Sequence, residues 1–116
     1  MDNTNESILN SIKKLLNISK DDKSFDTDII IHINSVINML LQLGVGPKEG
    51  FRITDDSETW GDYISEEDNI DYIKTYIYLK VKNLFDPPLN STVLEANKQM
   101  ASELEWRLNI ECDKEE

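Results

Sequence analysis

The residues that could carry out catalysis are few in this sequence, and they form no recognisable motif. His32 is the only histidine and Cys112 the only cysteine among 116 residues, so a catalytic triad or a multi-histidine metal site lacks its parts. The glycines at 44 and 46 follow an expected helix, whereas a phosphate-binding glycine loop follows a strand. We therefore expect no enzymatic activity, with His32 on a surface or interface and Cys112 as a dispensable thiol.

A cluster of acidic residues is the strongest candidate for a metal site; its members are Asp55, Asp56, Glu58 and Asp62. Counted from Asp56, Gly61 falls at the sixth position and Glu67 at the twelfth, as in a calcium-binding loop. However, Glu58 stands where Asp or Asn is usual, and Trp60 occupies a ligand position. We expect a solvated acidic turn here, and no metal or other cofactor.

The chain is strongly acidic, with 23 acidic against 12 basic residues and a net charge of −11. Tight nucleic-acid binding needs Lys and Arg to displace counterions from phosphates, so specific DNA binding is disfavoured, although DNA can pass nearby. Anionic membrane surfaces are disfavoured for the same reason. The longest apolar-rich stretch, residues 29–43, is too short and too polar to span a bilayer. Because no basic-then-apolar leader is present, we expect synthesis in a cytoplasm.

The spacing of apolar residues predicts a mainly helical fold, a compact four-helix domain that covers residues 1–116. Its ends, 1–4 and 111–116, are expected to be flexible. Between the second and third helices, residues 45–65 are expected to form a short β-hairpin or an extended loop.

The first two helices are predicted from their caps and their apolar stripes. One is expected over residues 4–17, capped by Asn3, and the other from a cap at Asp26 or Thr27 to residue 43. The stripe of the second helix is wide enough for a central helix that is contacted on two sides. Its members are Ile29, Ile30, Ile33, Val36, Ile37, Leu40, Leu41 and Leu43.

The third helix is expected over residues 65–85, with a capping box at Ser65 and Asp68 and an end before Pro87-Pro88. Its core positions are Ile70, Ile73, Ile77, Val81 and Leu84, flanked by Tyr72, Tyr76, Leu79 and Phe85. The fourth helix is expected over 92–109, capped by Thr92. Its inward positions are Val93, Ala96, Met100, Leu104 and Leu108.

The insert between the second and third helices combines strand and turn signals. Phe51 and Ile53 alternate with polar residues, as in a short strand, and a turn follows at 55–57. A structureless loop of about twenty residues is unusual in a small domain. We therefore expect an ordered excursion whose return to the core is anchored by Trp60, Tyr63 and Ile64.

Aromatic residues exceed what narrow core stripes on the last two helices need. One interpretation is that they flank the core. The other is that some lie at subunit interfaces, where Trp and Tyr are favoured anchors. The candidate interface residues are Phe51, Ile53, Trp60, Tyr63, Tyr76, Tyr78 and Trp106.

Several stretches together resemble the head–tail connector proteins of tailed bacteriophages, also called adaptor or head-completion proteins. They are FDTDIIIHIN at 25–34, QLGVGP at 42–47, KTYIYLK at 74–80, LFDPP at 84–88 and ELEWRL at 103–108. Each stretch alone is weakly specific, but they are specific in combination, and the resemblance runs from about Ile8 to Asn109, nearly the whole domain.

The resemblance implies a structural protein of the virion, made in the bacterial host cytoplasm and located at the head–tail interface. Such proteins form a ring, typically of twelve copies, under the portal protein. The ring meets a stopper or tail-completion protein and extends the DNA channel without binding DNA specifically. The family has no catalytic residues or cofactors to transfer. We hypothesise that the insert, over 46–63, contacts a neighbouring copy or the portal.

Two other functions remain open from the residues alone. A small acidic protein can mimic DNA and inhibit a basic partner, but a mimic should display its carboxylates in rows on one face. Here the acids are spread over expected helix starts, the insert and the tail. A small enzyme is the third possibility, and the single histidine argues against it.

Overall fold

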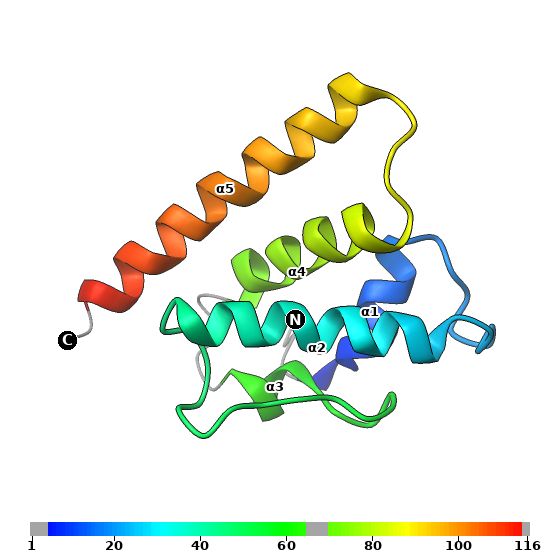
Figure 1. Ribbon diagram of the computed structural model, residues 1–116. Coiled ribbons are helices and arrows are strands. Elements are labelled where there is room, and N and C mark those ends of the chain that lie inside the picture. Colours follow the sequence, from blue (N-terminus) through cyan, green and yellow to red (C-terminus); the bar gives the residue numbers. More distant parts are fainter. Residues whose placement is uncertain (1–4, 65–69, 115–116) are drawn as a thin grey trace.

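Five helices make up most of the part of the chain that the structure, a computed structural model, describes. That part covers residues 5–64 and 70–114, and over 109–114 only the backbone. In chain order the helices are α1 (Ile8–Leu15), α2 (Asp26–Gln42), α3 (Trp60–Tyr63), α4 (Ile70–Phe85) and α5 (Ser91–Lys114) (Figure 1). The predicted mainly helical fold is confirmed. The insert is an extended loop, since the described residues contain no strand, only an isolated bridge between Ser7 and Thr59.

α2 lies at the centre of the fold and packs against both α1 and α4, as its wide apolar stripe predicted (Figure 1). α4 in turn packs against α5. Each fully buried aliphatic side chain contributes about 1.5–3 kcal/mol relative to an exposed one, so this central row is a main source of stability. The buried residues of α2 are Ile29, Ile33, Val36, Ile37 and Leu40. None of the described helices is long and apolar enough to cross a membrane.

α1 begins later than predicted, at Ile8 rather than at residue 4. Its N-cap is Ser7, whose Oγ accepts a hydrogen bond from the Asn10 backbone N–H at 3.2 Å. The backbone before Ile8 is held in an extended conformation by the insert: Ile8 N–H donates to the Glu58 carbonyl at 3.0 Å, and Trp60 N–H to the Glu6 carbonyl at 3.1 Å. The predicted cap, Asn3, lies outside the described residues.

α2 has nearly the predicted bounds, but its cap differs from the prediction. Asp26 is the first helical residue, and Phe25, at the N-cap position, makes no side-chain cap hydrogen bond. The Asp26 carboxylate instead faces Lys13 of α1, at 2.7 Å from its Nζ. The carboxylate of Asp26 therefore forms an ion pair with the buried Lys13 ammonium and does not cap α2.

The insert loop, residues 43–59, is fixed to α2 by one side chain. Asn34 donates from Nδ2 to the Ile53 carbonyl at 3.0 Å and accepts from the Ile53 N–H at 2.8 Å. The amide thus satisfies the backbone of Ile53 as a neighbouring strand would, which explains a strand-like residue without a sheet. Trp60, Tyr63 and Ile64 are buried, so the predicted anchoring of the insert on the core is confirmed.

α3 is a single turn that closes the insert. Thr59 and Asp62 form a capping box, in which each side chain accepts from the other's backbone N–H, at 3.2 and 3.0 Å. The indole N–H of Trp60 donates to Ser11 Oγ at 3.1 Å. The buried tryptophan is therefore satisfied by α1, 49 residues away.

α4 ends at Phe85, before Pro87-Pro88, as predicted. Its predicted start and capping box, at Ser65 and Asp68, lie outside the described residues. Ile70, Ile73, Ile77 and Val81 are buried as expected. Leu84 is not: it is 53% exposed, because it lies in the last turn, while Tyr76 and Leu79, predicted to flank the core, are buried.

α5 differs most from its prediction. It starts at Ser91 and runs to Lys114, beyond the predicted end at 109 and through residues predicted to be flexible. Its first N–H groups are satisfied by Asn90, whose Oδ1 accepts from Thr92 at 2.8 Å, so the predicted cap at Thr92 is wrong. Leu104 and Leu108 are buried as predicted, together with Ala101. Val93, Ala96 and Met100, predicted to face inward, are exposed, because only the second half of α5 is covered by the rest of the subunit.

Candidate functional site

The seven predicted interface residues occupy different environments in the subunit. Ile53, Trp60, Tyr63 and Tyr76 are buried in its own core, and Phe51 and Tyr78 pack partly against that core. Trp106 alone among the seven is largely exposed, at 65%. Core packing therefore accounts for most of the aromatic excess, and Trp106 is the member that exposes most of its surface to a partner.

A small pocket lies where the insert loop meets the end of α2. It has a volume of about 80 Å³ and is lined by Ile37, Asn38, Leu41, Val45, Pro47, Gly50, Phe51 and Tyr63. The rings of Phe51 and Tyr63 are stacked, with centroids 4.9 Å apart and planes 23° apart. Apart from Asn38 and the Tyr63 hydroxyl, the lining side chains are apolar. The pocket therefore suits an aliphatic group.

The hydroxyl of Tyr63 is the one polar group buried in this pocket wall. It has no hydrogen-bond partner among the described residues, and burial raises the pKa of Tyr63. Its ring lies against Gly46: a Cβ added there would be 2.8 Å from Cε1. Gly46 also has a φ of 96°, which residues with a side chain rarely adopt. The absence of a side chain at Gly46 therefore allows the ring of Tyr63 to pack against the backbone there.

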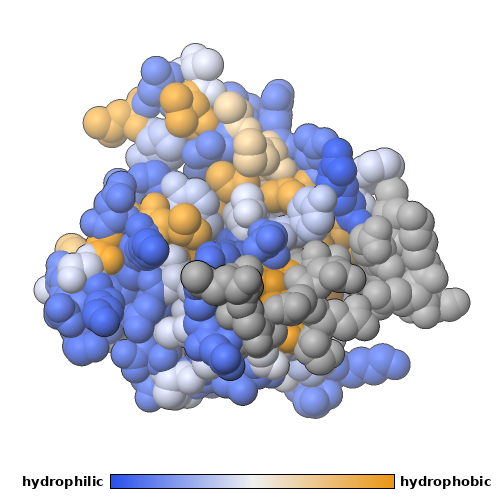
Figure 2. Space-filling view, turned by 180° about the vertical axis from the view of Figure 1, so that it is seen from behind, coloured by the Kyte–Doolittle hydropathy of each residue, from blue (hydrophilic) through white to orange (hydrophobic). Residues whose placement is uncertain are grey.

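A second surface consists of apolar side chains near the junction of α4 and α5. Leu89 is fully exposed, and Val93 and Met100 are 46% and 51% exposed. Leu89 precedes α5, whereas Val93, Ala96, which is also exposed, and Met100 recur every three or four residues and so lie along one flank of that helix. In Figure 2, hydrophobic side chains lie on the surface around the end where α4 joins α5. We call Val93, Ala96 and Met100 the α5 flank, and residues 86–90 the corner.

Polar contacts hold the second half of α5 onto α4. Tyr76 Oη donates to Glu105 Oε1 at 2.6 Å, and Lys80 Nζ lies 3.7 Å from the same oxygen. Burial, and then the hydrogen bond to Glu105, raises the pKa of Tyr76. These two contacts hold the part of α5 around Leu104 against α4, and the α5 flank takes no part in them.

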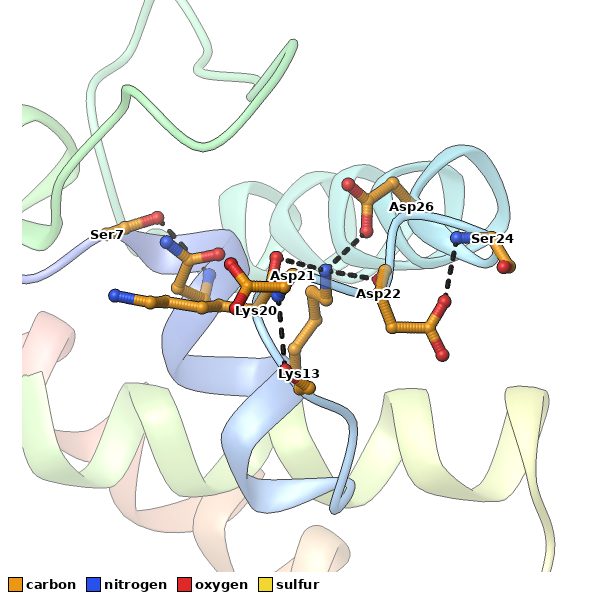
Figure 3. Close-up of polar contacts among 9 residues, drawn as sticks. Ser7, Lys13, Lys20, Asp21, Asp22, Ser24 and Asp26 are labelled. Atoms are coloured by element: carbon orange, nitrogen blue, oxygen red, sulfur yellow. Dashed lines mark hydrogen bonds and ion pairs between the residues drawn. The ribbon is translucent and has the colours of Figure 1, made fainter.

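Lys13 is a buried charge that the sequence interpretation missed as such. Its Nζ donates to the carbonyls of Lys20 and Asp22, at 3.2 and 2.7 Å, and pairs with the carboxylate of Asp26 (Figure 3). The signal was available: Lys13 shares a helix face with Leu9 and Leu16, so it points inward. It organises the loop between α1 and α2 rather than a reaction site.

Side chains of the acidic cluster accept hydrogen bonds from nearby residues of the insert. Asp55 accepts from the N–H and Oγ of Ser57, and hydrogen bonds from this serine lower the pKa of Asp55. Glu58 accepts from the N–H and Oγ1 of Thr54. Within the described residues no group of three or more His, Cys, Asp or Glu side chains is placed to hold a metal. Glu67, the expected twelfth position of a calcium loop, lies outside them.

His32 is half-buried, and its ring lies edge-on to Phe85, with centroids 6.4 Å apart. The ring of Phe25, in the loop before α2, also lies edge-on to Phe85, with ring centroids 5.5 Å apart. These rings join the start of α2 to the end of α4. Packing is thus the role that the structure shows for His32. For Cys112 only the backbone, within α5, is described.

The sequence of this chain matches the model of a phage connector protein family over residues 8–115, and the chain belongs to that family. It is a family of structural rather than enzymatic proteins, and membership implies a role in connecting the phage head to the tail. Comparisons with curated proteins and with solved structures found no significant match.

Proposed function

We propose that this protein forms an oligomeric ring, of twelve copies, beneath the portal of a tailed phage. There it joins the head to the tail, extends the DNA channel, and receives a stopper or tail-completion protein on its far side. The observation that carries the proposal is membership of the connector family, because the match spans almost the whole chain.

The surface of the subunit supports a role in assembly. A soluble monomer usually exposes apolar residues singly, whereas contiguous apolar surface marks an interaction site. Here Leu89 in the corner and the α5 flank that follows it are exposed, and Trp106 is exposed further along α5. A ring needs such surfaces, because each copy contacts two neighbours and a portal at once.

The charge of the chain suits a DNA channel. Each copy carries −11, so twelve copies carry on the order of −130. A bore lined by part of this charge repels the phosphates and lets DNA slide without binding.

Electron microscopy of the purified protein, alone and mixed with the portal of its own phage, tests this proposal. A twelve-fold ring stacked coaxially on the portal is the expected result, with the mass of the complex giving the number of copies. A monomer that ignores the portal, or that binds a basic host enzyme in low salt instead, would contradict it and favour the acidic-inhibitor alternative.

The hypothesis that the insert contacts a neighbouring copy or the portal is tested better by point variants than by deleting residues 49–58. Ile53 lies within that segment and is fully buried, so the deletion would remove part of the core. Exposed positions of the same loop, such as Lys48 and Arg52, can be changed without that loss.

A further inference from the structure

The exposed side of α2 has an unusual composition for a helix surface. From residue 29 to residue 47 the chain contains no Asp, Glu, Lys or Arg, although these types make up 30% of the whole sequence. One side of α2 is buried in the core, but the other faces solvent, where a helix normally carries charges. The lack of charge there needs an explanation other than burial within the subunit. The exposed residues are Ile31, Ser35, Asn38, Met39 and Gln42, which we call the α2 outer face.

The α2 outer face has the composition of a contact surface. Ile31 is 56% exposed and Met39 40% exposed, so this face is uncovered in the single subunit. The centre of a protein–protein interface is depleted of charged residues and enriched in methionine. The polar groups here are neutral, and Ser35 Oγ already donates to the Ile31 carbonyl at 3.0 Å. Covering this face therefore removes no charge from water.

The net charge of the chain indicates which partner the α2 outer face meets. A basic partner would be met through carboxylates, because opposite charges across an interface favour docking. The chain has 23 acidic residues and places none of them on this face. An acidic partner has to be met through uncharged surface, since like charges in contact repel. A second copy, with the same net charge of −11, is such a partner.

The α5 flank is the matching surface on the second copy. Val93 and Met100 are 46% and 51% exposed. The charged residues next to them in sequence, Glu95 and Lys98, lie on other sides of the helix. The α5 flank is therefore apolar and uncharged, like the centre of an interface.

The exposed sides of the other described helices carry charged residues, Lys14 in α1, Asp62 in α3 and Asp71 in α4. Further along the stripe of the α5 flank, Glu103 and Arg107 pair with each other at 3.0 Å, so they add no net charge. The α2 outer face and the α5 flank are thus the two helix surfaces of the described chain that can meet without repulsion.

The spacing of residues on both helices suits packing of one helix against the other. Residues 31, 35, 38 and 42 follow one another at intervals of four, three and four, and residues 93, 96 and 100 at intervals of three and four. Such intervals place side chains in one stripe along a helix, as in paired helices. A small residue, Ser35 or Ala96, lies within each stripe and allows the two helix axes to approach closely.

The two surfaces cannot meet within one copy. The buried side of α2 packs against α1 and α4, so the α2 outer face points away from α4. α4 lies between α2 and α5 (Figure 1), and the hydrogen bond from Tyr76 to Glu105 holds α5 there. Two different, matching surfaces on one subunit are what a head-to-tail contact requires, and such contacts close into rings.

We infer that the α2 outer face of one copy packs against the α5 flank of the next copy around the ring. The occupant of each surface is thus a second copy of this chain. The inference rests on the proposed ring and specifies its repeated contact.

Charges introduced on the two surfaces test the contact in rings assembled on the portal. Ser35→Glu and Ala96→Glu each put a carboxylate into one surface, and each should lower the yield of rings about tenfold or more. The double variant Ser35→Lys/Ala96→Glu brings opposite charges together at every contact and should restore the rings. The matched double variant Ser35→Glu/Ala96→Glu brings like charges together and should stay defective.

Two controls separate the contact from folding and from net charge. Ser35 and Ala96 are exposed, so the melting temperature of the free subunit should be nearly unchanged in all four variants. Ser24→Glu adds one negative charge in the loop before α2, outside both surfaces, and should assemble like the wild type.

The outcomes separate this inference from the proposed function. A normal yield of rings from Ser35→Glu or from Ala96→Glu overturns the contact and leaves the connector role intact. Failure of Ser35→Lys/Ala96→Glu to assemble better than Ser35→Glu/Ala96→Glu also overturns it, since the two surfaces then meet other partners, such as the portal. Absence of a wild-type ring on the portal refutes the connector proposal and the contact with it.

Discussion

The insert and α5 show opposite relations between regular structure and burial. The insert has a single helical turn, yet Ile53, Trp60 and Tyr63 are fully or almost fully buried. α5 is an unbroken helix of 24 residues, yet the α5 flank and Trp106 are exposed. The irregular segment is part of the core, while much of the regular one is surface.

The difference follows from where each backbone finds its hydrogen bonds. The insert needs specific partners, Asn34 for Ile53 and Glu6 for Trp60, and these contacts pull it onto the core. A helix satisfies its own backbone, so it can stand partly clear of the subunit without that cost. Side chains on the uncovered flank of α5 are therefore available to a partner.

The two tryptophans give the largest expected contrast. Trp60→Ala should lower the free energy of unfolding by about 3–5 kcal/mol, because it leaves a cavity in the core. Trp106→Ala should change it by no more than about 0.5 kcal/mol, since the side chain is largely in solvent. Urea denaturation of both variants measures this. Similar losses in the two would mean that α5 and the insert do not differ as described.

The buried lysine should rank next. Lys13→Met should cost about 3 kcal/mol, because Asp26 and two loop carbonyls lose the cation they face. Lys14→Met, at the exposed neighbouring position, is the matched control and should cost no more than about 0.5 kcal/mol. If denaturation shows both variants to be equally stable, the loop between α1 and α2 does not depend on this ammonium.

The amide that holds the insert should have a smaller effect. Asn34→Ala should cost about 2 kcal/mol, since the buried N–H and carbonyl of Ile53 lose their partner. Hydrogen exchange should show lost protection at the Ile53 amide. Asn38→Ala, an exposed amide one turn later, should leave both measurements unchanged. Retained protection in Asn34→Ala would show that the insert is held in another way.

Alkaline pH should weaken both regions slightly. Burial raises the pKa of Tyr63 and of Tyr76 above the ordinary 10.0, so the folded state keeps protons that the unfolded chain releases. The stabilisation is then fully present below pH 10 and is lost as the pH rises above it. Melting temperatures between pH 8 and 11 should fall less steeply for Tyr76→Phe. An identical slope would contradict the burial of this phenol in its protonated form.

The smallest effect on folding is expected at the α5 flank. Val93→Ser and Met100→Ser should each change stability by no more than about 0.5 kcal/mol, because both positions are exposed. The same variants should reduce assembly if this flank contacts a partner. Thermal unfolding and ring mass, measured side by side, separate the two effects. A large loss of stability would mean that the flank already packs within the subunit.

Local signals in the sequence were sufficient for much of the fold. Pro87-Pro88 gave the end of α4, and the spacing from Ile29 to Leu40 gave the central helix. Trp60 and Tyr63 were identified as anchors because large aromatic residues close an otherwise polar insert. These features depend on backbone chemistry or on apolar spacing, which a single sequence contains.

The features that the sequence did not give depend on contacts between distant segments. Asn34 and Ile53 are 19 residues apart, and nothing in either segment specifies their pairing. The spacing of apolar residues in α5 showed which side chains share a face of the helix, but not whether α4 or another chain covers that face. This is why Val93 and Met100 were expected in the core, and why two interpretations of the aromatic residues, core and interface, stayed open.

Oxidative footprinting of the free protein and of the assembled phage neck tests the central claim most directly, namely that the corner, the α5 flank and Trp106 are surface that the subunit presents to its partners. Trp60 should be protected in both states, while Trp106, Met100 and Leu89 should be labelled in the free protein and protected after assembly. Equal labelling of these three residues in both states would contradict the claim and place the assembly contacts elsewhere.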